Sequence, residues 1–473
     1  MRYLSTRDPR PSPPALSFTE ALLAGLAEDG GLYVPDRLPV LDEATLRDYA
    51  SLPYAELAAR VVSLFAGETF ATDELQQLTI AAYSSFTRAA VVPLVQLDER
   101  LWLLELFHGP TLAFKDLALQ LVGRMFDAVL ARRHEHITVV GATSGDTGSA
   151  ALEACRDRDA IDIFMLFPHN RVSEIQRRQM TTVDSSNVHA IAVEGTFDDC
   201  QDLVKTLFGD AKLRCALNLS AVNSINWARI AAQTVYYFAA GVALGAPGRP
   251  ISFSVPTGNF GNVYAGHIAR RMGLPIDRLV IGTNRNDILA RYFATGRMAI
   301  APVEPSFTPS MDIQVASNFE RLLFELKGHD GAAVSEVMRF FRQNGRMPED
   351  DQGWRTARGL FSTHKVDDTH TMDTIAETYA RSGSLIDPHT AIAVAAAQTE
   401  IRAGNTIAPM IALACAHPAK FPDVVERATG LRPILPAALS DILERRERLV
   451  VLPNDLGAVT RFIHGRARRA GNF

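Results

Sequence analysis

Apolar residues recur at helical spacing through the first ninety positions. The runs at 18–30, "FTEALLAGLAEDG", and 54–67, "YAELAARVVSLFAG", both have the spacing of amphipathic helices. Between them, "DGGLYVPDRLP" at 29–39 has the glycines and prolines of a loop and room for one short strand. The pattern therefore predicts a mostly helical amino-terminal module over residues 1–90.

The pattern changes near residue 100, where short apolar runs begin to alternate with longer helical stretches. This alternation predicts an α/β fold of doubly wound parallel sheets with helices on both faces. In such sheets, ligands bind beyond the carboxyl ends of the strands. Strands are expected at 101–106, 136–141, 161–167, 188–193, 251–256, 278–283 and 407–415, and helices at 115–133, 147–158, 197–210, 225–245 and 260–273.

We expect two α/β domains after the amino-terminal module. Residues 91–210 are predicted to form the smaller domain and residues 211–473 the larger one, with approximate edges that can interleave. The stretch 296–385 is less regular and is expected to be an inserted or peripheral segment. A chain of 473 residues with 47% hydrophobic residues is long enough for this arrangement.

Charge and cysteine content reduce the number of possible partners, locations and kinds of site. The net charge is −5 without a basic block, which argues against nucleic acid as a partner. We expect no signal peptide or membrane span, because prolines interrupt the amino-terminus and no apolar run is long enough. Its four cysteines lie far apart, so no metal site or disulfide framework is expected, and a cytoplasmic location fits.

Lys115 stands where the predicted strand at 101–106 leads into the predicted helix at 115–133, within "HGPTLAFKDLALQ". Lysine at a helix start is more often a solvated surface residue. Its apolar neighbours favour burial instead, which would lower its pKa and make it a nucleophile or base. Such an amine can form a Schiff base with a carbonyl cofactor.

Two glycine-rich loops follow other predicted strands, in "VVGATSGDTGSA" at 139–150 and "VPTGNFGNVYAG" at 255–266. Neither phosphate-loop nor dinucleotide fingerprints fit the first loop, because no lysine follows Gly148 and its glycines have the wrong spacing. A helix amino-terminus can bind an anion, although an ordinary strand–turn–helix with a serine cap is the alternative. Together with Lys115, the loops predict a ligand with a phosphate, a second acidic group and a carbonyl.

These motifs resemble those of the threonine synthase family, pyridoxal-phosphate enzymes of the tryptophan-synthase-β fold type, also called fold type II. "HGPTLAFKD" is similar to the family's lysine motif, "ATSGDTGSA" to its substrate-carboxylate loop, and "PTGNFGN" to its cofactor-phosphate loop. The resemblance implies that the cofactor lies in the cleft between the two α/β domains. Further similar segments, in the family's order, are "RYLSTR", "AEDGGLYVP", "AVNSINWAR" (221–229), "IDPHTAIA" (386–393) and "AHPAKF" (416–421).

The resemblance also implies roles for individual residues. Lys115 would carry pyridoxal 5'-phosphate as a Schiff base and then move protons at the α and β carbons of the substrate. Asp146 would lie near the phenolic oxygen of the cofactor. The cofactor phosphate would bind to Gly258, Asn259, Phe260, Gly261 and Asn262.

Substrate contacts are implied in two segments. Thr143, Ser144 and Thr147 would bind the substrate carboxylate. The segment "NSINWAR" would face the substrate phosphate, for which an arginine is suited by its planar fork; the alternative is helix capping by Asn223 or Ser224, with Arg229 in solvent. The residues of this segment are Asn223, Ser224, Asn226 and Arg229.

Cys415 departs from the family pattern, which usually has threonine before "AHPAKF", with its hydroxyl facing the pyridine nitrogen. A thiol is a weaker hydrogen-bonding group than a hydroxyl. Either Cys415 takes that role weakly, or a water or a neighbouring group does; the alternative is that Cys415 is a small buried apolar residue at a strand end. In "DPHTA", Asp387 is predicted to cap a helix that begins at Pro388.

The implied reaction converts O-phospho-L-homoserine and water into L-threonine and phosphate, the last step of threonine biosynthesis. A phospho-lyase of the same fold, which releases 2-oxobutyrate, is the nearest alternative. A serine or threonine dehydratase and a catalytically silent relative are further alternatives, and the presence of Lys115 argues against the last. The enzyme is expected to be a monomer or a homodimer.

Overall fold

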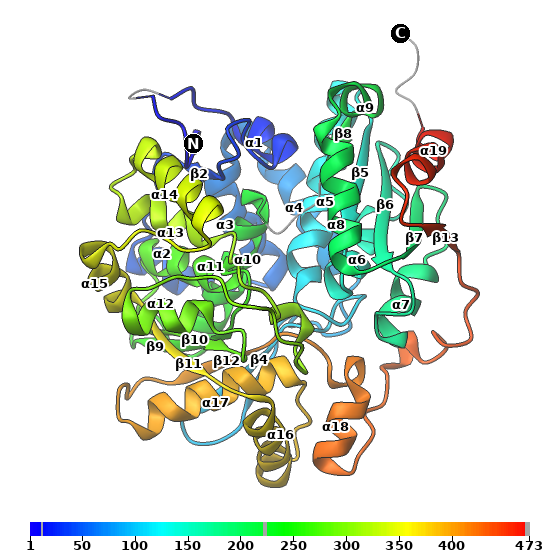
Figure 1. Cartoon of the computed structure of the whole chain (residues 1–473). Coiled ribbons are helices and arrows are strands. Elements are labelled where there is room, and N and C mark those ends of the chain that lie inside the picture. The colour runs from blue at the N-terminus through cyan, green and yellow to red at the C-terminus, as the bar shows by residue number, and fades with distance from the viewer. Residues whose placement is uncertain (11–12, 221–224, 469–473) are drawn as a thin grey trace.

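The computed structural model describes residues 1–10, 13–220 and 225–468. Two sheets lie side by side, each covered by helices, and the amino-terminal helices pack where the two meet (Figure 1). One continuous apolar core joins the amino-terminal module to the inner faces of both sheets, and separate apolar clusters lie under the outer helices. The predicted fold class, doubly wound parallel sheets with a helical module, is confirmed.

The amino-terminal module consists of short helices and one small antiparallel pair of strands. Its first helix begins with a capping box, in which Ser17 and Glu20 satisfy each other's backbone N–H groups. Its elements are β1 (Tyr3–Ser5), α1 (Phe18–Ala24), β2 (Tyr33–Pro35), α2 (Glu43–Tyr49), α3 (Tyr54–Ala66), η1 (Gly67–Thr69) and α4 (Thr72–Tyr83).

The larger sheet has six strands in the order β11-β10-β9-β12-β4-β3. All neighbouring pairs are parallel except β3 and β4 at one edge. Its central strands are buried along their whole length, as expected for strands covered on both faces. The strands are β3 (Leu94–Gln96), β4 (Leu101–Glu105), β9 (Ile251–Pro256), β10 (Ile276–Thr283), β11 (Ser362–Lys365) and β12 (Met410–Ala414).

The smaller sheet has five parallel strands in the order β13-β7-β6-β5-β8. Its strands are β5 (Ile137–Ala142), β6 (Ile161–Pro168), β7 (Val188–Glu194), β8 (Leu219–Ser220) and β13 (Leu449–Pro453). Because β4 belongs to the larger sheet and β13 to the smaller one, the two α/β units interleave along the chain. The domain edges near residues 90 and 210 stay a prediction.

Helices after the amino-terminal module cover both faces of the sheets; Figure 1 shows α17 below the larger sheet, with α10 and α11 above it. The longest, α5, begins at Lys115 and ends at Arg133, as its unbroken apolar pattern predicts. The helices are α5 (Lys115–Arg133), α6 (Asp146–Cys155), α7 (Glu174–Thr181), α8 (Phe197–Gly209), α9 (Ala211–Leu217), α10 (Trp227–Ala243), α11 (Gly261–Arg271), α12 (Ile288–Thr295), η2 (Pro309–Met311), α13 (Phe319–Leu326), α14 (Gly331–Asn344), α15 (Asp351–Leu360), α16 (Asp368–Ser382), α17 (Pro388–Arg402), η3 (Pro418–Lys420), α18 (Pro422–Thr429), η4 (Ala437–Leu439) and α19 (Leu456–Arg466).

Helix α13 ties the amino-terminal module to the rest of the molecule. Its buried Glu320 accepts hydrogen bonds from Arg7 Nη2 at 2.6 Å and Thr6 Oγ1 at 2.6 Å. Arg321, fully buried, donates to the carbonyl of Tyr33 at 3.2 Å and also to Asn318 Oδ1 and the Ile225 carbonyl. The module is therefore fixed against the segments that lead into α10 and α13.

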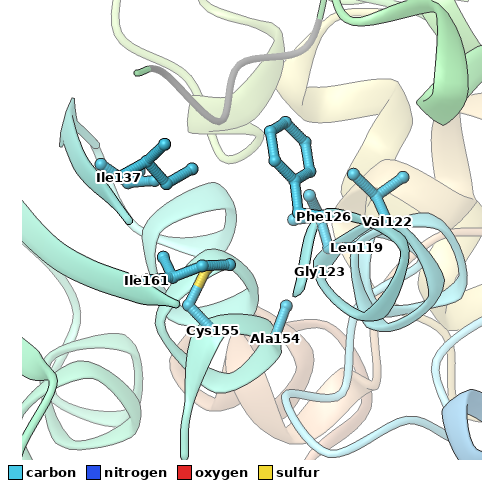
Figure 2. A pocket seen from close by; sticks show the side chains of 9 residues that line it. Leu119, Val122, Gly123, Phe126, Ile137, Ala154, Cys155 and Ile161 are labelled. Atoms are coloured by element: carbon cyan, nitrogen blue, oxygen red, sulfur yellow. The ribbon is translucent and has the colours of Figure 1, made fainter. Parts of the chain in front are cut away.

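A small cavity lies between α5, α6 and the strands β5 and β6 (Figure 2). It is lined by apolar side chains, glycine and the thiol of Cys155. None of the described residues that line it is charged, so it offers nothing to an anionic substrate. Among the described residues, no helix is long and apolar enough to cross a membrane.

Candidate active site

Strand ends bring distant segments of the chain together at one edge of the larger sheet. Strand β12 lies between β9 and β4 and runs parallel to both. The segments that follow these three strands therefore emerge at the same edge. They carry the loop to Lys115, the loop to α11 and the segment of Cys415.

The loop that leads to Lys115 is held by buried hydrogen bonds. Thr111 donates its backbone N–H at 2.8 Å and its hydroxyl at 2.7 Å to the carboxylate of Asp116. Leu112 adopts a left-handed backbone conformation, with φ 59°. Burial raises the pKa of Asp116 to about 6, although the bonds from Thr111 oppose the shift. The loop thus fixes where α5 begins.

Lys115 is buried, with 8% of the residue exposed, so the alternative of a solvated lysine is wrong. Its Nζ lies 3.6 Å from Asp146 Oδ2 and 4.9 Å from the ring centroid of Phe114. Burial lowers the pKa of Lys115, and the nearby carboxylate of Asp146 only partly opposes this. The structure therefore favours the neutral, nucleophilic form of this amine more than water does.

Asp146 belongs to the α/β unit of the smaller sheet. It is the first residue of α6, which follows β5. Its Oδ1 accepts hydrogen bonds from Lys420 Nζ at 2.8 Å and from Gln176 Nε2 at 2.8 Å. Burial favours the neutral acid, but the charges of Lys420 and Lys115 outweigh it and hold the pKa of Asp146 well below its usual range. Asp146 is therefore a carboxylate that faces two amines.

The loop before α6 is organised by Thr143. Its hydroxyl oxygen accepts from the N–H groups of Gly145 at 3.0 Å and Gly148 at 2.9 Å. Gly145 is the cap residue, so the expected alternative of a serine cap is not what the structure shows. Ser144 is exposed and Thr147 half-buried, which leaves both open to a ligand, while their contact with a carboxylate stays a prediction.

The loop between β9 and α11 leaves little room for a side chain at Gly258, its second residue. A Cβ on Gly258 would lie 3.0 Å from the carbonyl oxygen of Ser310 and 3.1 Å from the Cα of Met311. Phe260 caps α11 in a left-handed conformation with φ 66°, and its buried ring packs against Phe319. The loop is thus bent so that the amino-terminus of α11 begins at Gly261.

The two asparagines of this loop bond to the protein. Asn259 Oδ1 accepts from the backbone N–H of Ser317 at 2.6 Å. Asn262 Oδ1 accepts from the hydroxyls of Tyr236 at 2.6 Å and Tyr237 at 2.9 Å. Both side chains therefore shape the loop. That this loop binds a cofactor phosphate stays a prediction, and the backbone N–H groups would make the contacts.

Cys415 follows the end of β12 and is buried, with its Sγ 3.9 Å from Asn262 Nδ2. Burial raises the pKa of the Cys415 thiol, so the group stays protonated at neutral pH. Both interpretations of this residue, a weak partner of a pyridine nitrogen and a buried apolar residue, stay predictions. Asp387 caps α17 as predicted, accepting from the N–H of Thr390 at 3.0 Å.

Asn226 and Arg229 lie at the start of α10. Asn226 caps the helix through Ala228 N at 3.0 Å, so it has the capping role that the sequence suggested for Asn223 or Ser224. Asn223 and Ser224 lie outside the described residues. Arg229 is only 3% exposed, which contradicts the alternative of a solvated arginine, and neither its Nε nor its Nη1 has a hydrogen-bond partner among the described residues.

Burial lowers the pKa of Arg229 to about 10, which leaves the guanidinium charged at neutral pH. It is close enough to Lys115 to contribute to the lowered pKa of that amine. An unpaired charge in a protein interior is costly unless a ligand pairs with it. Arg229 is therefore a buried cation near Lys115, and its predicted contact with a substrate phosphate stays a prediction.

Sequence reasoning missed two residues of the site. Lys420 lies in the segment "AHPAKF", and its charge within this mostly apolar segment was the feature that could have indicated a site residue. Gln176 had no signal, because it reaches Asp146 from α7. Both contact the same carboxylate oxygen and fix its orientation.

These residues fit pyridoxal phosphate. A buried amine of lowered pKa can attach the aldehyde. The glycine-bent start of α11 can hold a phosphate. The protonated thiol of Cys415 can hydrogen-bond weakly to a ring nitrogen.

Comparison with known proteins covers almost the whole chain. The family model described as "Threonine synthase N terminus" matches residues 2–83, "Pyridoxal-phosphate dependent enzyme" matches 87–339, and "Threonine synthase, C-terminal" matches 390–463. A threonine synthase from Pseudomonas aeruginosa is 54% identical over 468 residues, which cover 98% of this chain and 99% of that protein.

Solved structures agree with the sequence matches. A threonine synthase from Brucella melitensis, solved with pyridoxal phosphate bound, aligns with a TM-score of 0.96 at 49% identity, covering 99% of this chain and 100% of that one. The threonine synthase from Escherichia coli aligns with a TM-score of 0.81 at 29% identity, covering 98% and 100%. With its buried lysine and these full-length matches, the chain belongs to the threonine synthase family of pyridoxal-phosphate enzymes.

Proposed function

We propose that this enzyme converts O-phospho-L-homoserine and water into L-threonine and phosphate. The observation that carries the proposal is Arg229, a buried guanidinium near Lys115, two of whose nitrogen atoms have no hydrogen-bond partner among the described residues. A substrate with a phosphate at one end and a carboxylate at the other needs two anion sites besides the site for the cofactor phosphate. Arg229, the start of α6 and the start of α11 supply three.

Roles for the remaining residues follow from their positions. The backbone at Gly258 to Asn262 would hold the cofactor phosphate, and Cys415 would face the ring nitrogen. Asp146 would lie by the phenolic oxygen as a carboxylate, since Lys420 and Gln176 orient it. Thr143 shapes the loop in which Ser144 and Thr147 would bind the substrate carboxylate.

Pyridoxal phosphate supplies an electron sink for negative charge at the substrate α carbon when it is bound. Lys115 would take the proton from that carbon, because burial favours its neutral form. Arg229 would hold the phosphate until it leaves the γ carbon. Holding both ends of the substrate lowers the entropic part of the barrier.

The test is a product assay with purified, cofactor-loaded enzyme and O-phospho-L-homoserine. Threonine and phosphate should appear in equal amounts. 2-Oxobutyrate and ammonia in place of threonine would show a phospho-lyase, and no phosphate release would overturn the substrate assignment. Enzyme with Lys115→Ala, assayed in parallel, corrects for spontaneous hydrolysis.

The two loops should respond differently to substitution. Gly261→Asp should weaken retention of pyridoxal phosphate, because it adds a like charge and a Cβ that would lie 3.1 Å from Asn318 Nδ2. Ser144→Ala should keep the cofactor and raise KM for O-phospho-L-homoserine by roughly tenfold, the effect of losing a hydrogen bond to a charged group. Equilibrium dialysis and steady-state kinetics measure both. Cofactor loss in Ser144→Ala with full retention in Gly261→Asp would reverse the assignment.

We further propose a cytoplasmic enzyme that is a monomer or a homodimer. Cys155, Cys200 and Cys415 are free and buried, which fits a reducing compartment. Light scattering coupled to size-exclusion chromatography distinguishes the two oligomeric states.

A further inference from the structure

Lys420 is a lysine with no exposed surface, which is rare for this residue type. It ends η3, the short helix after β12. Its Nζ donates to Asp146 Oδ1 at 2.8 Å and to the carbonyl of Thr111 at 2.7 Å. It thereby joins the loop of Lys115 to the loop that begins α6.

The backbone around Lys420 is fastened to the lysine loop. Phe114 N–H donates to the Cys415 carbonyl at 2.8 Å, and His417 N–H donates to the Leu112 carbonyl at 3.0 Å. With the bond from Lys420 to the carbonyl of Thr111, three contacts align the two segments. Hydrogen bonds of the backbone and of Lys420 Nζ itself therefore fix the position of the ammonium.

Asp146 faces two amines at different distances. Lys420 Nζ is within hydrogen-bond distance of Oδ1 at 2.8 Å, whereas Lys115 Nζ lies 3.6 Å from Oδ2. All three side chains are buried, so an uncompensated charge among them is strongly disfavoured. An ion pair between Asp146 and Lys420 is neutral as a whole, and it lets Lys115 be neutral as well.

We propose that Lys420 is a positioning residue that neutralises Asp146 and so keeps Lys115 available as a free amine for attachment of pyridoxal phosphate. The inference rests on the proposed role of Lys115 as the attachment site. It assigns Lys420 no contact with the reacting atoms. Its effect passes through the carboxylate of Asp146.

The charges around Lys115 give the sign of the effect. Burial lowers the pKa of Lys115 most; Asp146 raises it, Lys420 lowers it, Cys415 raises it and Arg229 lowers it. Without Lys420, the carboxylate of Asp146 would have Lys115 as its nearest cation. The pKa of Lys115 would then rise, because its ammonium form would be paired with the carboxylate of Asp146. Less of the amine would therefore be unprotonated at neutral pH.

The experiment measures attachment of pyridoxal phosphate to apoenzyme by absorbance, across pH from neutrality to the ordinary pKa of lysine. Borohydride trapping and peptide mapping confirm that the adduct forms on Lys115. In Lys420→Met, the pH profile of the attachment rate should move about one unit to the alkaline side. At neutral pH this corresponds to roughly tenfold slower attachment.

Two further variants separate charge balance from damage to the fold. Asp146→Asn should move the profile to the acid side, because it removes the charge that raises the pKa of Lys115. The double variant Asp146→Asn/Lys420→Met should lose the alkaline shift of Lys420→Met. Lys327→Met is the matched control: it breaks a lysine–aspartate pair of 2.8 Å with Asp350 and should leave the profile unchanged.

The outcomes separate this inference from the proposed function. Attachment in wild-type enzyme with an unshifted profile in Lys420→Met would overturn the role of Lys420 alone. No adduct on Lys115 of the wild-type enzyme would overturn the proposed attachment site. If circular dichroism shows that Lys420→Met is unfolded, the Asp146→Asn profile decides, and an alkaline shift or no shift there contradicts the inference.

Discussion

Lys115→Ala should lower turnover by more than ~10²–10⁴-fold, which is the loss that removal of general acid–base catalysis alone typically causes. The reason is that one amine would serve two purposes, attachment of the cofactor and proton transfer at the substrate carbons. Its burial and its place 3.6 Å from Asp146 Oδ2 suit both. Steady-state assays with O-phospho-L-homoserine measure the loss.

Chemical labelling makes this prediction specific. Borohydride reduction of the wild-type holoenzyme followed by peptide mapping should place the label on Lys115, and a label on another lysine would contradict the assignment. Lys205, whose Nζ forms an exposed 2.9 Å ion pair with Asp202, supplies the control. Lys205→Ala should keep full activity and normal labelling.

The central strands and helices were predictable because their burial requires apolar residues at regular spacing within a short stretch of sequence. Residues 161–167, for example, are apolar except Asp162, and the strand β6 is buried throughout. By contrast, β11 and β13 were not predicted. The first is the polar "STHK" at a sheet edge, and the second is a partly exposed edge strand. Their position depends on pairing with distant strands, which no local pattern records.

The candidate site shows the same division. Lys115 and the glycine loops were predictable because strand–loop–helix junctions are local features. The charge of Lys420 was visible in the sequence, but its contacts were not, because its Nζ reaches Asp146 and the carbonyl of Thr111, which lies 309 residues away along the chain. The burial of Arg229 likewise arises from tertiary packing, since α10 lies against α3, α5 and α11.

Arg229→Lys should lower kcat/KM for O-phospho-L-homoserine at least tenfold, corresponding to ~1.4 kcal/mol of transition-state stabilisation. A guanidinium binds a phosphate through two parallel hydrogen bonds, which the single ammonium of lysine does not reproduce. Slow dehydration of L-serine, which has no phosphate, should change much less. Parallel kinetics with both substrates measure this difference.

Stability provides the second half of the test, because Arg229 is buried and its Nε and Nη1 have no partner in the part of the chain that the structure describes. Replacing an uncompensated buried charge by an apolar side chain of similar length should leave the protein as stable or make it more stable. Arg229→Met should therefore retain or raise the melting temperature of the ligand-free enzyme while it loses turnover of O-phospho-L-homoserine. If Arg229 were a structural residue of α10, the same variant would melt at lower temperature, and both substrates would be turned over more slowly to a similar degree. That pattern would leave the phosphate of the substrate without an assigned partner on α10.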